Sequence, residues 1–401
     1  MRLREKMYFL LGKCLMALRK NRKKRKNCII LVADCVKPRV KKIGYALRKK
    51  GYYVILLADI KNRNEIDKEN KKFYNNVSFF SGKEEVYSKC LQYRPLVYHI
   101  FSEAAVMPWP EYLIRNRHYL GKVVYDQYDI YRGFVTEDLD DIAEREKYCL
   151  ENADGLCCRM FETQFLKHAY RYKFNGKRIL FFDYCWNLHK RMKVPLKGVE
   201  SLKLVYGGRL LAKSIRNVER YRVELNGFEH IAKTMQDKNS YFVIVPSNTC
   251  EGAAYSAYRN LRRKYSHLLI KEPMSYKRLI RYEQHMDYGI DCVELEADIE
   301  ALCNKENSFN IKAKNHYYAT NKYFDYLDAG IMPIYGRKGE LFGNYLAHFG
   351  GAIWCTLEEM PEKINELKMK REENRKKACK ARELFAIENQ IDRLIDFYKE
   401  I

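Results

Sequence analysis

Short apolar runs alternate along this chain with longer stretches in which apolar residues recur every three or four positions. The first unit has apolar runs at 28–34 and 52–58, and the helical pattern between them runs from 40 to 50. A strand, a helix and a second strand in that order predict a parallel sheet of the α/β class. Further strands are predicted at 96–101, 122–125, 153–157, 178–182, 202–206, 241–245, 267–270, 286–292 and 353–355.

The length of 401 residues exceeds one ordinary domain and fits two, each with a sizeable core. The stretch 188–201 contains Pro195 and Gly198 and lacks apolar periodicity, which predicts a linker. We therefore expect a basic segment at 1–26, domains at 27–190 and 201–384, and a final helix at 385–401. An apolar face is expected along this C-terminal part of the chain, and its residues are Leu384, Ile387, Ile391, Leu394, Ile395 and Tyr398.

The net charge of +24 is concentrated at the N-terminus, where residues 1–26 hold eleven Lys and Arg against one Glu. Apolar residues in this segment repeat at helical spacing, and seven of the eight residues at 19–26 are basic. An amphipathic helix followed by a basic tract is typical of segments that bind anionic membrane surfaces. A solvated helix stays open as an alternative. A signal peptide fits less well, because its apolar core would contain Lys13 and precede basic residues.

The thirteen cysteines are scattered and form no C-x-x-C motif. This pattern indicates free thiols in a reducing cytoplasm, with neither a disulfide framework nor a zinc site.

A short, sharply delimited helix is predicted after position 320. Asn321 is positioned to cap it, Lys322 lies in its first turn, Asp325 follows one turn later and Gly330 ends it. The N-terminus of such a helix binds anions, and Lys322 would add a full positive charge. Asp325 could accept hydrogen bonds from a neighbouring ribose. A capped core helix with solvated charges is the alternative.

A second candidate anion site follows the predicted strand at 202–206. Gly207 and Gly208 would let the backbone approach a phosphate, and Arg209 and Lys213 could neutralise it. Taken alone, this pattern indicates a tight turn equally well.

Acidic residues follow a predicted strand of the first domain, at Asp126 and Asp129. Ligands of open α/β sheets bind beyond the carboxyl ends of strands, so a carboxylate there could remove a proton from a substrate hydroxyl. A helix cap or a loop hydrogen bond is the alternative for either residue. His99 is expected to be a hydrogen-bonded histidine at a strand end.

The stretch Asn-Lys-Tyr-Phe-Asp-Tyr-Leu-Asp-Ala-Gly-Ile-Met-Pro at 321–333 resembles the nucleotide-binding helix of GT-B glycosyltransferases, written Ser/Asn-Lys-x-x-Glu-Tyr-x-x-x-Gly-x-Pro. Asp325 stands where that pattern has Glu. The Gly-Gly-Arg-Leu at 207–210 is similar to the glycine loop of the same family, and Tyr-Asp-Gln-Tyr-Asp at 125–129 resembles the Tyr-Asp-x-x-Asp segment of some bacterial members. The first turn of the chain, Cys-Val-Lys-Pro-Arg at 35–39, departs from the glycine-rich turn often found there.

This resemblance implies two Rossmann-like domains whose parallel sheets face each other across a cleft, with a C-terminal helix that returns to the first domain. It implies that Arg209, Lys213 and Lys322 hold the donor's diphosphate. The nucleobase would then lie against Pro273 and Met274, with Asn321 and Asp325 completing the donor site. Asp126 or Asp129 would be the base if the reaction inverts; the stereochemistry stays open. No metal and no cofactor beyond the nucleotide-sugar substrate are expected.

The expected function is therefore transfer of a sugar from a nucleotide-diphosphate sugar to a glycan or polyprenyl-diphosphate-linked acceptor. The enzyme would work in the cytoplasm, as a peripheral protein on the inner face of the plasma membrane. One alternative is a sugar-nucleotide 2-epimerase of the same fold. Another is a non-catalytic basic scaffold or nucleic-acid-binding protein, although no recognised nucleic-acid motif is present and no such partner is expected.

Overall fold

The computed structural model describes residues 27–63, 66, 72–102, 107–127, 140–159, 161–186, 200–214, 218–291, 293–305, 316–317 and 320–401. The basic segment 1–26, Asp129 and nearly all of the expected linker lie outside these ranges. The chain divides into two compact units, one spanning Met1–Phe182 and Gln390–Ile401, the other Asp183–Asn389.

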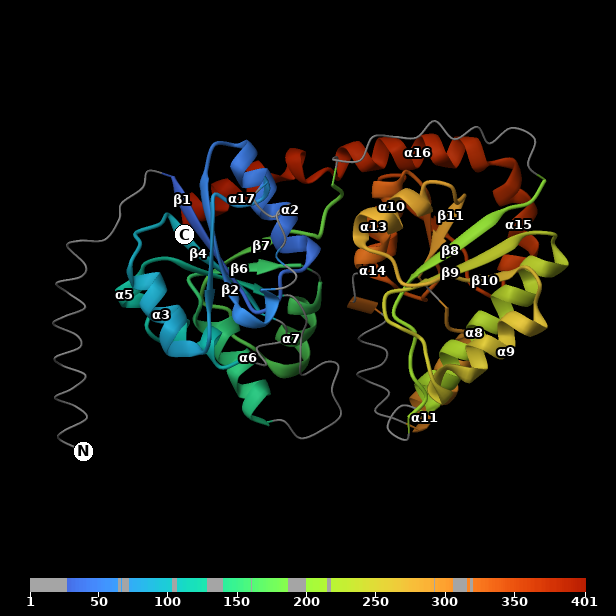
Figure 1. Ribbon diagram of the computed structural model, residues 1–401, viewed down its shortest axis with the longest axis horizontal. Coiled ribbons are helices and arrows are strands. Elements are labelled where there is room, and N and C mark those ends of the chain that lie inside the picture. Colours follow the sequence, from blue (N-terminus) through green and yellow to red (C-terminus); the bar gives the residue numbers. More distant parts are fainter. Residues whose placement is uncertain are drawn as a thin grey trace. The chain divides into compact units, whose positions relative to one another are not determined.

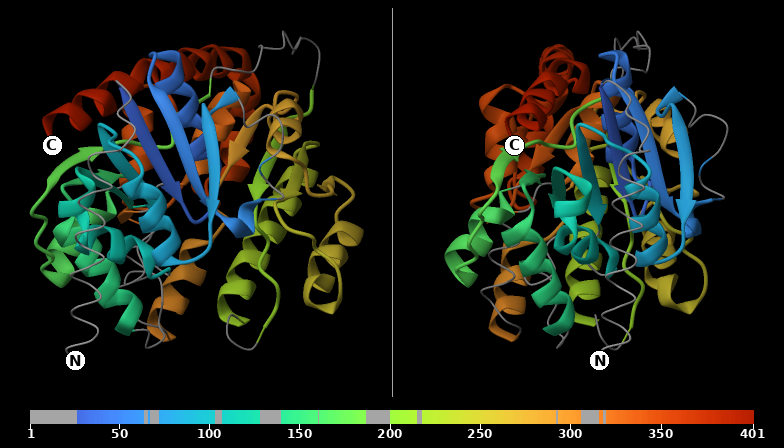
Figure 2. Two further views of the ribbon diagram at one scale, coloured as in Figure 1. Left: turned by 60° about the vertical axis from the view of Figure 1, so that its left-hand side comes forward. Right: turned by 90° about the vertical axis from the view of Figure 1, so that its left-hand side faces the viewer.

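The first unit is built on a seven-stranded parallel sheet in the order β3-β2-β1-β4-β5-β6-β7. Figure 2 shows its first strands side by side in blue. The order reverses between β1 and β4, which is where open α/β sheets bind ligands. The strands are β1 (Cys28–Ala33), β2 (Tyr53–Asp59), β3 (Asn76–Phe80), β4 (Val97–Ser102), β5 (Val123–Gln127), β6 (Gly155–Cys158) and β7 (Lys177–Leu180).

Helices connect these strands, as the alternating pattern predicted. Both β1 and β4 are buried along their whole length, which places the core of the unit on the central strands. The helices are α2 (Pro38–Lys49), α3 (Lys83–Leu91), α4 (Trp109–Arg115), α5 (Arg117–Leu120), α6 (Asp140–Asn152) and α7 (Glu162–Tyr170).

The second unit repeats this design with a six-stranded parallel sheet in the order β10-β9-β8-β11-β12-β13. Its order reverses between β8 and β11. The strands are β8 (Lys203–Gly208), β9 (Tyr241–Pro246), β10 (Leu268–Ile270), β11 (Tyr288–Ile290), β12 (Met332–Tyr335) and β13 (Ile353–Trp354). The helices are α8 (Val218–Asp237), α9 (Ser256–Lys264), α10 (Tyr276–Glu283), α11 (Glu296–Lys305), α13 (Asn321–Ala329), α14 (Leu341–His348), α15 (Met360–Met369) and α16 (Arg371–Leu384).

The C-terminal helix α17 (Ile387–Glu400) carries the apolar face that the sequence predicted, with one exception. Five of the six expected residues are buried, whereas Leu384 is 45% exposed. Leu384 ends α16, and the chain turns before α17 begins, so its side chain leaves the shared face. Residues from Gln390 onward pack in the first unit, where Figure 1 shows α17 in red beside the sheet.

Two strands were not predicted, β3 and β12. Both are short, and short apolar runs cannot be distinguished from helix or loop by periodicity. In β12, Pro333 pairs with Gly289 of β11, so the proline that was expected to follow the helix lies inside the second sheet. None of the described helices combines the length and apolar character needed to cross a membrane.

Candidate functional site

Two glycines end β8 at the point where the order of the second sheet reverses. The Gly207 N–H donates to the hydroxyl of Tyr326 at 3.0 Å, which ties the end of β8 to helix α13. A Cβ on Gly208 would overlap Cε of Lys322, so any larger residue here would push the lysine side chain away from the backbone. The strand was predicted to end at 206 with the glycines in a turn, but both glycines belong to β8, and Gly208 is a direct neighbour of the predicted lysine.

Helix α13 begins one residue earlier than its predicted cap implied. The cap is Thr320, whose hydroxyl accepts from the Lys322 N–H at 3.3 Å, and Asn321 is the first helical residue. Gly330 ends the helix in the left-handed conformation with φ 76°, as predicted. The threonine hydroxyl fulfils the capping role because it can accept the same early N–H group as asparagine.

The ammonium group of Lys322 lies between an aromatic ring and a carboxylate. Its Nζ is 2.6 Å from Oδ1 of Asp291, which directly follows β11, and 5.3 Å from the ring centroid of Tyr206. The Lys322 side chain is 22% exposed, whereas that of Asp291 is 2% exposed. The charge of the lysine therefore faces the carboxyl edge of the sheet, with its counter-ion behind it.

Asp325 lies one turn after Lys322 and is partly exposed. Its Oδ1 accepts from the hydroxyl of Tyr276 at 2.8 Å. Tyr276 is the first residue of α10, and Figure 1 shows α10 and α13 together in the second unit. This contact connects Asp325 to the predicted nucleobase loop, because Pro273 and Met274 come just before Ser275, the N-cap of α10.

The remaining predicted binding residues lie on loops at the carboxyl edge of the second sheet. Arg209 and Lys213 follow β8 with exposed side chains, Pro273 is exposed, and Met274 is partly exposed. The backbone after β8 is held by the Leu210 N–H, which donates to the Asn248 side chain at 3.0 Å. The structure therefore brings Gly208 into contact with Lys322, ties Gly207 to Tyr326 of the same helix, and places Arg209 and Lys213 on the loop that follows.

The residues that hold Lys322 were not among those predicted from the sequence. Asp291 also binds Arg337, whose Nη1 lies 3.0 Å from Oδ2, and Arg337 in turn binds Glu294 at 3.2 Å. These two cations outweigh the burial of Asp291, and they hold the pKa of its carboxyl well below its ordinary value. The signal that could have found Asp291 is its position directly after a buried strand, beside the glycine turn.

Several carboxyl groups of this region are buried. Burial raises the pKa of Glu224 to about 7, although its Oε1 accepts from the Leu211 N–H at 3.0 Å and the Tyr258 hydroxyl at 2.5 Å. Burial also raises the pKa of Glu340 to about 7 and that of Glu283 well above its ordinary value. Glu283 lies beside Gly207, where an added Cβ would be 2.7 Å from its Oε1. The candidate site is therefore richer in acids than the sequence indicated.

In the first unit, Asp126 lies inside β5, because the strand continues to Gln127 instead of ending at Tyr125. Its carboxylate is completely buried and binds Nε and Nη2 of Arg39 at 2.9 and 2.8 Å. Burial alone would raise its pKa, but the arginine and His99 lower the pKa to about 2. Such a carboxylate is held as an ion pair, a geometry that favours a structural role over that of a solvent-facing base.

His99 continues this buried network. Its Nε2 lies 3.1 Å from Oδ2 of Asp126, and its Nδ1 lies 2.5 Å from the hydroxyl of Tyr398 in α17. Burial lowers the pKa of His99, so the neutral ring donates to Asp126 and accepts from Tyr398. Both ring nitrogens are hydrogen-bonded, as the sequence predicted, but His99 lies in the middle of β4 and not at its end.

Comparison with solved structures decides the fold. The chain is similar to HepE (Alr3699) of Anabaena in complex with UDP, with a TM-score of 0.64 and 9% identity over 93% of this chain and 100% of that one. It is also similar to the UDP-GlcNAc 2-epimerase of Neisseria meningitidis bound to UDP-GlcNAc (TM-score 0.51, 8% identity, 93% and 100% covered). A third match is an O-GlcNAc transferase mutant of Thermobaculum terrenum (TM-score 0.53, 11% identity, 94% and 68% covered). The chain has the GT-B fold.

No protein-family model and no curated protein sequence matches the chain. The GT-B fold occurs in both a transferase and an epimerase among these matches, so the fold does not choose the reaction. That choice depends on the residues of the site.

Within the described part of this GT-B chain, the donor atoms of His99, Asp126 and Cys157 lie within 4.8 Å of one another, close enough for a metal site. A metal ion there would have to displace Arg39 from Asp126. It would also need Cys157 as a thiolate, whereas burial raises the pKa of this thiol well above its ordinary value. The three residues therefore fit a hydrogen-bonded core better than a metal site.

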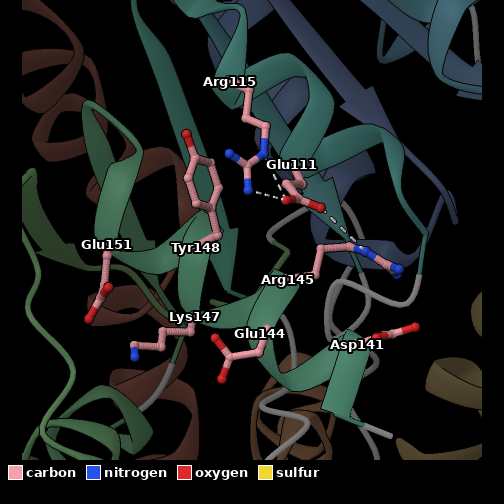
Figure 3. A pocket seen from close by; sticks show the side chains of 8 residues that line it. All are labelled: Glu111, Arg115, Asp141, Glu144, Arg145, Lys147, Tyr148 and Glu151. Atoms are coloured by element: carbon pink, nitrogen blue, oxygen red, sulfur yellow. Dashed lines mark hydrogen bonds and ion pairs between the residues drawn. The ribbon is translucent and has the colours of Figure 1, made fainter.

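The first unit of the GT-B chain also has a polar groove of about 430 Å³ between α4 and α6. Figure 3 shows Arg115 beside Tyr148 and Glu111, 3.7 Å from the ring centroid and 2.7 Å from the carboxylate, and Arg145 lies 3.6 Å from the other oxygen of Glu111. None of the predicted site residues lines this groove.

Proposed function

We propose that this GT-B chain is a glycosyltransferase that uses a nucleotide-diphosphate sugar as its donor. The observation that carries the proposal is the contact between Gly208 and Lys322 at the capped N-terminus of α13. The glycines that end β8, a lysine and a helix N-terminus meet where the strand order of the second sheet reverses. These are the elements that bind phosphate groups in α/β folds.

Each part of the donor has a proposed partner. Lys322 and the α13 N-terminus bind the diphosphate, with Arg209 and Lys213 on the loop after β8 adding positive charge. Asp325 binds the ribose hydroxyls, and the nucleobase lies against Pro273 and Met274. Fixed cations of this kind stabilise a departing nucleotide diphosphate, which supports transfer without a metal ion.

The proposed base for an inverting reaction is Asp129, which lies outside the described residues. Asp126 was the other candidate, and its bidentate ion pair with Arg39 supports a structural role instead. A general base must reach the acceptor hydroxyl within hydrogen-bonding distance, and both oxygens of Asp126 are bound to buried neighbours.

The proposed acceptor is a glycan or a polyprenyl-diphosphate-linked sugar at the cytoplasmic face of the plasma membrane. The support for this choice is the basic amphipathic segment at 1–26, which supplies +10 of the net charge of +24. Such a segment would bring the enzyme to an anionic lipid surface.

A 2-epimerase acting on nucleotide sugars is the second candidate. Its specific support is the group of acids near Lys322, including Asp291, Glu224 and Glu294. Incubation of the protein with a nucleotide sugar, with and without a glycan acceptor, separates the two reactions. An epimerase converts the sugar without any acceptor, whereas a transferase needs the acceptor to form its product.

A thermal-shift screen with UDP, GDP, CDP and their sugars tests the proposal. A ligand that binds only the folded state increases the free energy of unfolding by RT ln(1 + [L]/Kd). The melting temperature rises as a result. We expect one nucleotide series to stabilise the protein clearly over the others. No shift with any nucleotide diphosphate or nucleotide sugar would instead support a non-catalytic scaffold.

A further inference from the structure

Arg337 shares its counter-ion with the lysine of the proposed donor site. Asp291 receives Lys322 on Oδ1 at 2.6 Å and Arg337 on Oδ2 at 3.0 Å. The two cations come from segments that are separate in sequence, the first turn of α13 and the turn after β12. One carboxylate therefore holds both cations in a fixed spacing.

The burial of these three groups follows a gradient. The side chain of Asp291 is 2% exposed, that of Arg337 is 12% exposed and that of Lys322 is 22% exposed. Asp291 lies inside and the cations lie nearer the surface, where Arg337 is also bound by Glu294, which is 25% exposed. The most exposed cation, Lys322, has a buried carboxylate as its ion-pair partner, so it presents positive charge outward and suits an anionic ligand.

Arg337 lies at the same edge of the second sheet as the two glycines that end β8. Strands β8, β11 and β12 are adjacent and parallel, so their carboxyl ends lie at one edge. Gly208 ends β8, Asp291 follows β11, and Arg337 comes two residues after the end of β12. Neighbouring strands are about 4.8 Å apart, so the three positions lie within the span of one nucleotide sugar.

We propose that Arg337 is a further diphosphate-binding residue of the donor site, and that Asp291 is the positioning residue that holds it beside Lys322. The inference rests on the proposed function and deepens it. Arginine suits this role because its planar guanidinium can bind a carboxylate and a phosphate oxygen at the same time. Two fixed cations would then balance the charge of the diphosphate, despite the acids around them.

The test is titration calorimetry with inorganic pyrophosphate, and with UDP, GDP and CDP, on the full-length chain. Arg337→Ala should weaken binding of pyrophosphate and of the preferred nucleotide at least tenfold, and Arg337→Lys should restore part of the loss. Asp291→Asn should also weaken both ligands, because neither cation keeps its anchor. The matched control is Lys338→Ala, a neighbouring exposed lysine paired with Glu296, which should change affinity less than twofold.

The outcomes separate this inference from the proposal on which it rests. If the unaltered protein binds none of the four ligands, the proposed function fails and Arg337 loses its role with it. If the unaltered protein binds and Arg337→Ala binds equally well, only the role of Arg337 is wrong. Tighter binding by Asp291→Asn would show that Asp291 competes with the ligand and does not position the cations. Melting temperatures measured without ligand identify variants that fail to fold. If Arg337→Ala does not fold, the affinity of Arg337→Lys is compared with that of the unaltered protein instead.

Discussion

The hydroxyl of Tyr276 lies 2.8 Å from Oδ1 of Asp325 and joins the start of α10 to α13. The same hydroxyl lies 3.3 Å from Oδ2 of Asp328. Tyr276 therefore restrains Asp325 from one side and connects it to the loop in which the nucleobase is proposed to bind. A substitution of Asp325 can therefore separate the contribution of the ribose to binding from that of the diphosphate.

Asp325→Ala should weaken a nucleoside diphosphate more than it weakens free pyrophosphate, because only the nucleotide carries the ribose hydroxyls. The expected extra loss is about 1.5 to 3 kcal/mol, the range for hydrogen bonds to a charged group. Tyr276→Phe should cause a smaller loss, since it removes the restraint and leaves the carboxylate. Calorimetric titrations with both ligands measure the difference. Equal losses for nucleotide and pyrophosphate would exclude the ribose contact.

Asp126→Asn should destabilise the first unit strongly, because it leaves the buried Arg39 without a counter-ion. Loss of one partner of a buried pair costs about 3 to 5 kcal/mol. Tyr398→Phe removes one neutral hydrogen bond to His99 and should cost about 1 kcal/mol. Urea unfolding measures both values. The control is Lys50→Ala, which removes an exposed pair with Asp392 and should cost under about 1 kcal/mol.

A different result for Asp126→Asn would change the role assigned to Asp126. An Asp126→Asn variant that is as stable as the original chain but has lost transferase activity would return Asp126 to the role of base.

Glu340 should make the protein less stable as pH rises from about 5 to 7. Its pKa is about 7 in the folded chain, because of burial, against an ordinary value of 4.5. The folded state therefore holds a proton that the unfolded state has already released, so stability falls through this range and levels off above it. The difference amounts to roughly 3 kcal/mol.

Glu340→Gln should flatten this dependence and be the more stable form at pH 8. Glu224 has a similarly raised pKa and is expected to leave part of the slope in place. Chemical denaturation at pH 5, 6, 7 and 8 provides the measurement. Identical slopes for the two proteins would show that Glu340 titrates normally.

Residues 1–26 should bind vesicles that contain anionic lipid. Each Lys or Arg near the surface contributes on the order of 1 kcal/mol before the effect saturates. Cosedimentation should weaken as salt rises toward 1 M, where the Debye length shortens to about 3 Å. Deletion of the segment should release the protein from vesicles and leave nucleotide binding intact. A truncated chain that sediments equally well would place the membrane contact elsewhere on this basic protein.

Apolar periodicity was sufficient to predict the α/β class and most of the strands, because buried parallel strands are continuous apolar runs. The helix at α13 was found for a local reason, since a polar cap and Gly330 delimit it within ten residues. The cap was misplaced by one position because asparagine and threonine accept the same hydrogen bond.

The unpredicted features depend on contacts between distant residues. Arg39 lies 87 positions before Asp126, and Asp291 lies 46 positions before Arg337. Local sequence contains no signal for either pair. Asp126 was expected beyond a strand end, and two further strand residues were enough to enclose it. Arg382, near the end of the charged helix α16, is likewise buried, and its Nε lies 3.6 Å from Oδ1 of Asp328.

The central claim is that Lys322 binds the diphosphate of a nucleotide sugar. Its most direct test is a calorimetric comparison of Lys322→Ala with the exposed control Lys338→Ala, using the nucleoside diphosphate that stabilises the unaltered protein most. Loss of a charge-assisted contact should cost about 1.5 to 3 kcal/mol, which is a loss of affinity of roughly 10- to 150-fold. The control should bind like the unaltered chain. Normal binding by a folded Lys322→Ala variant would contradict the account.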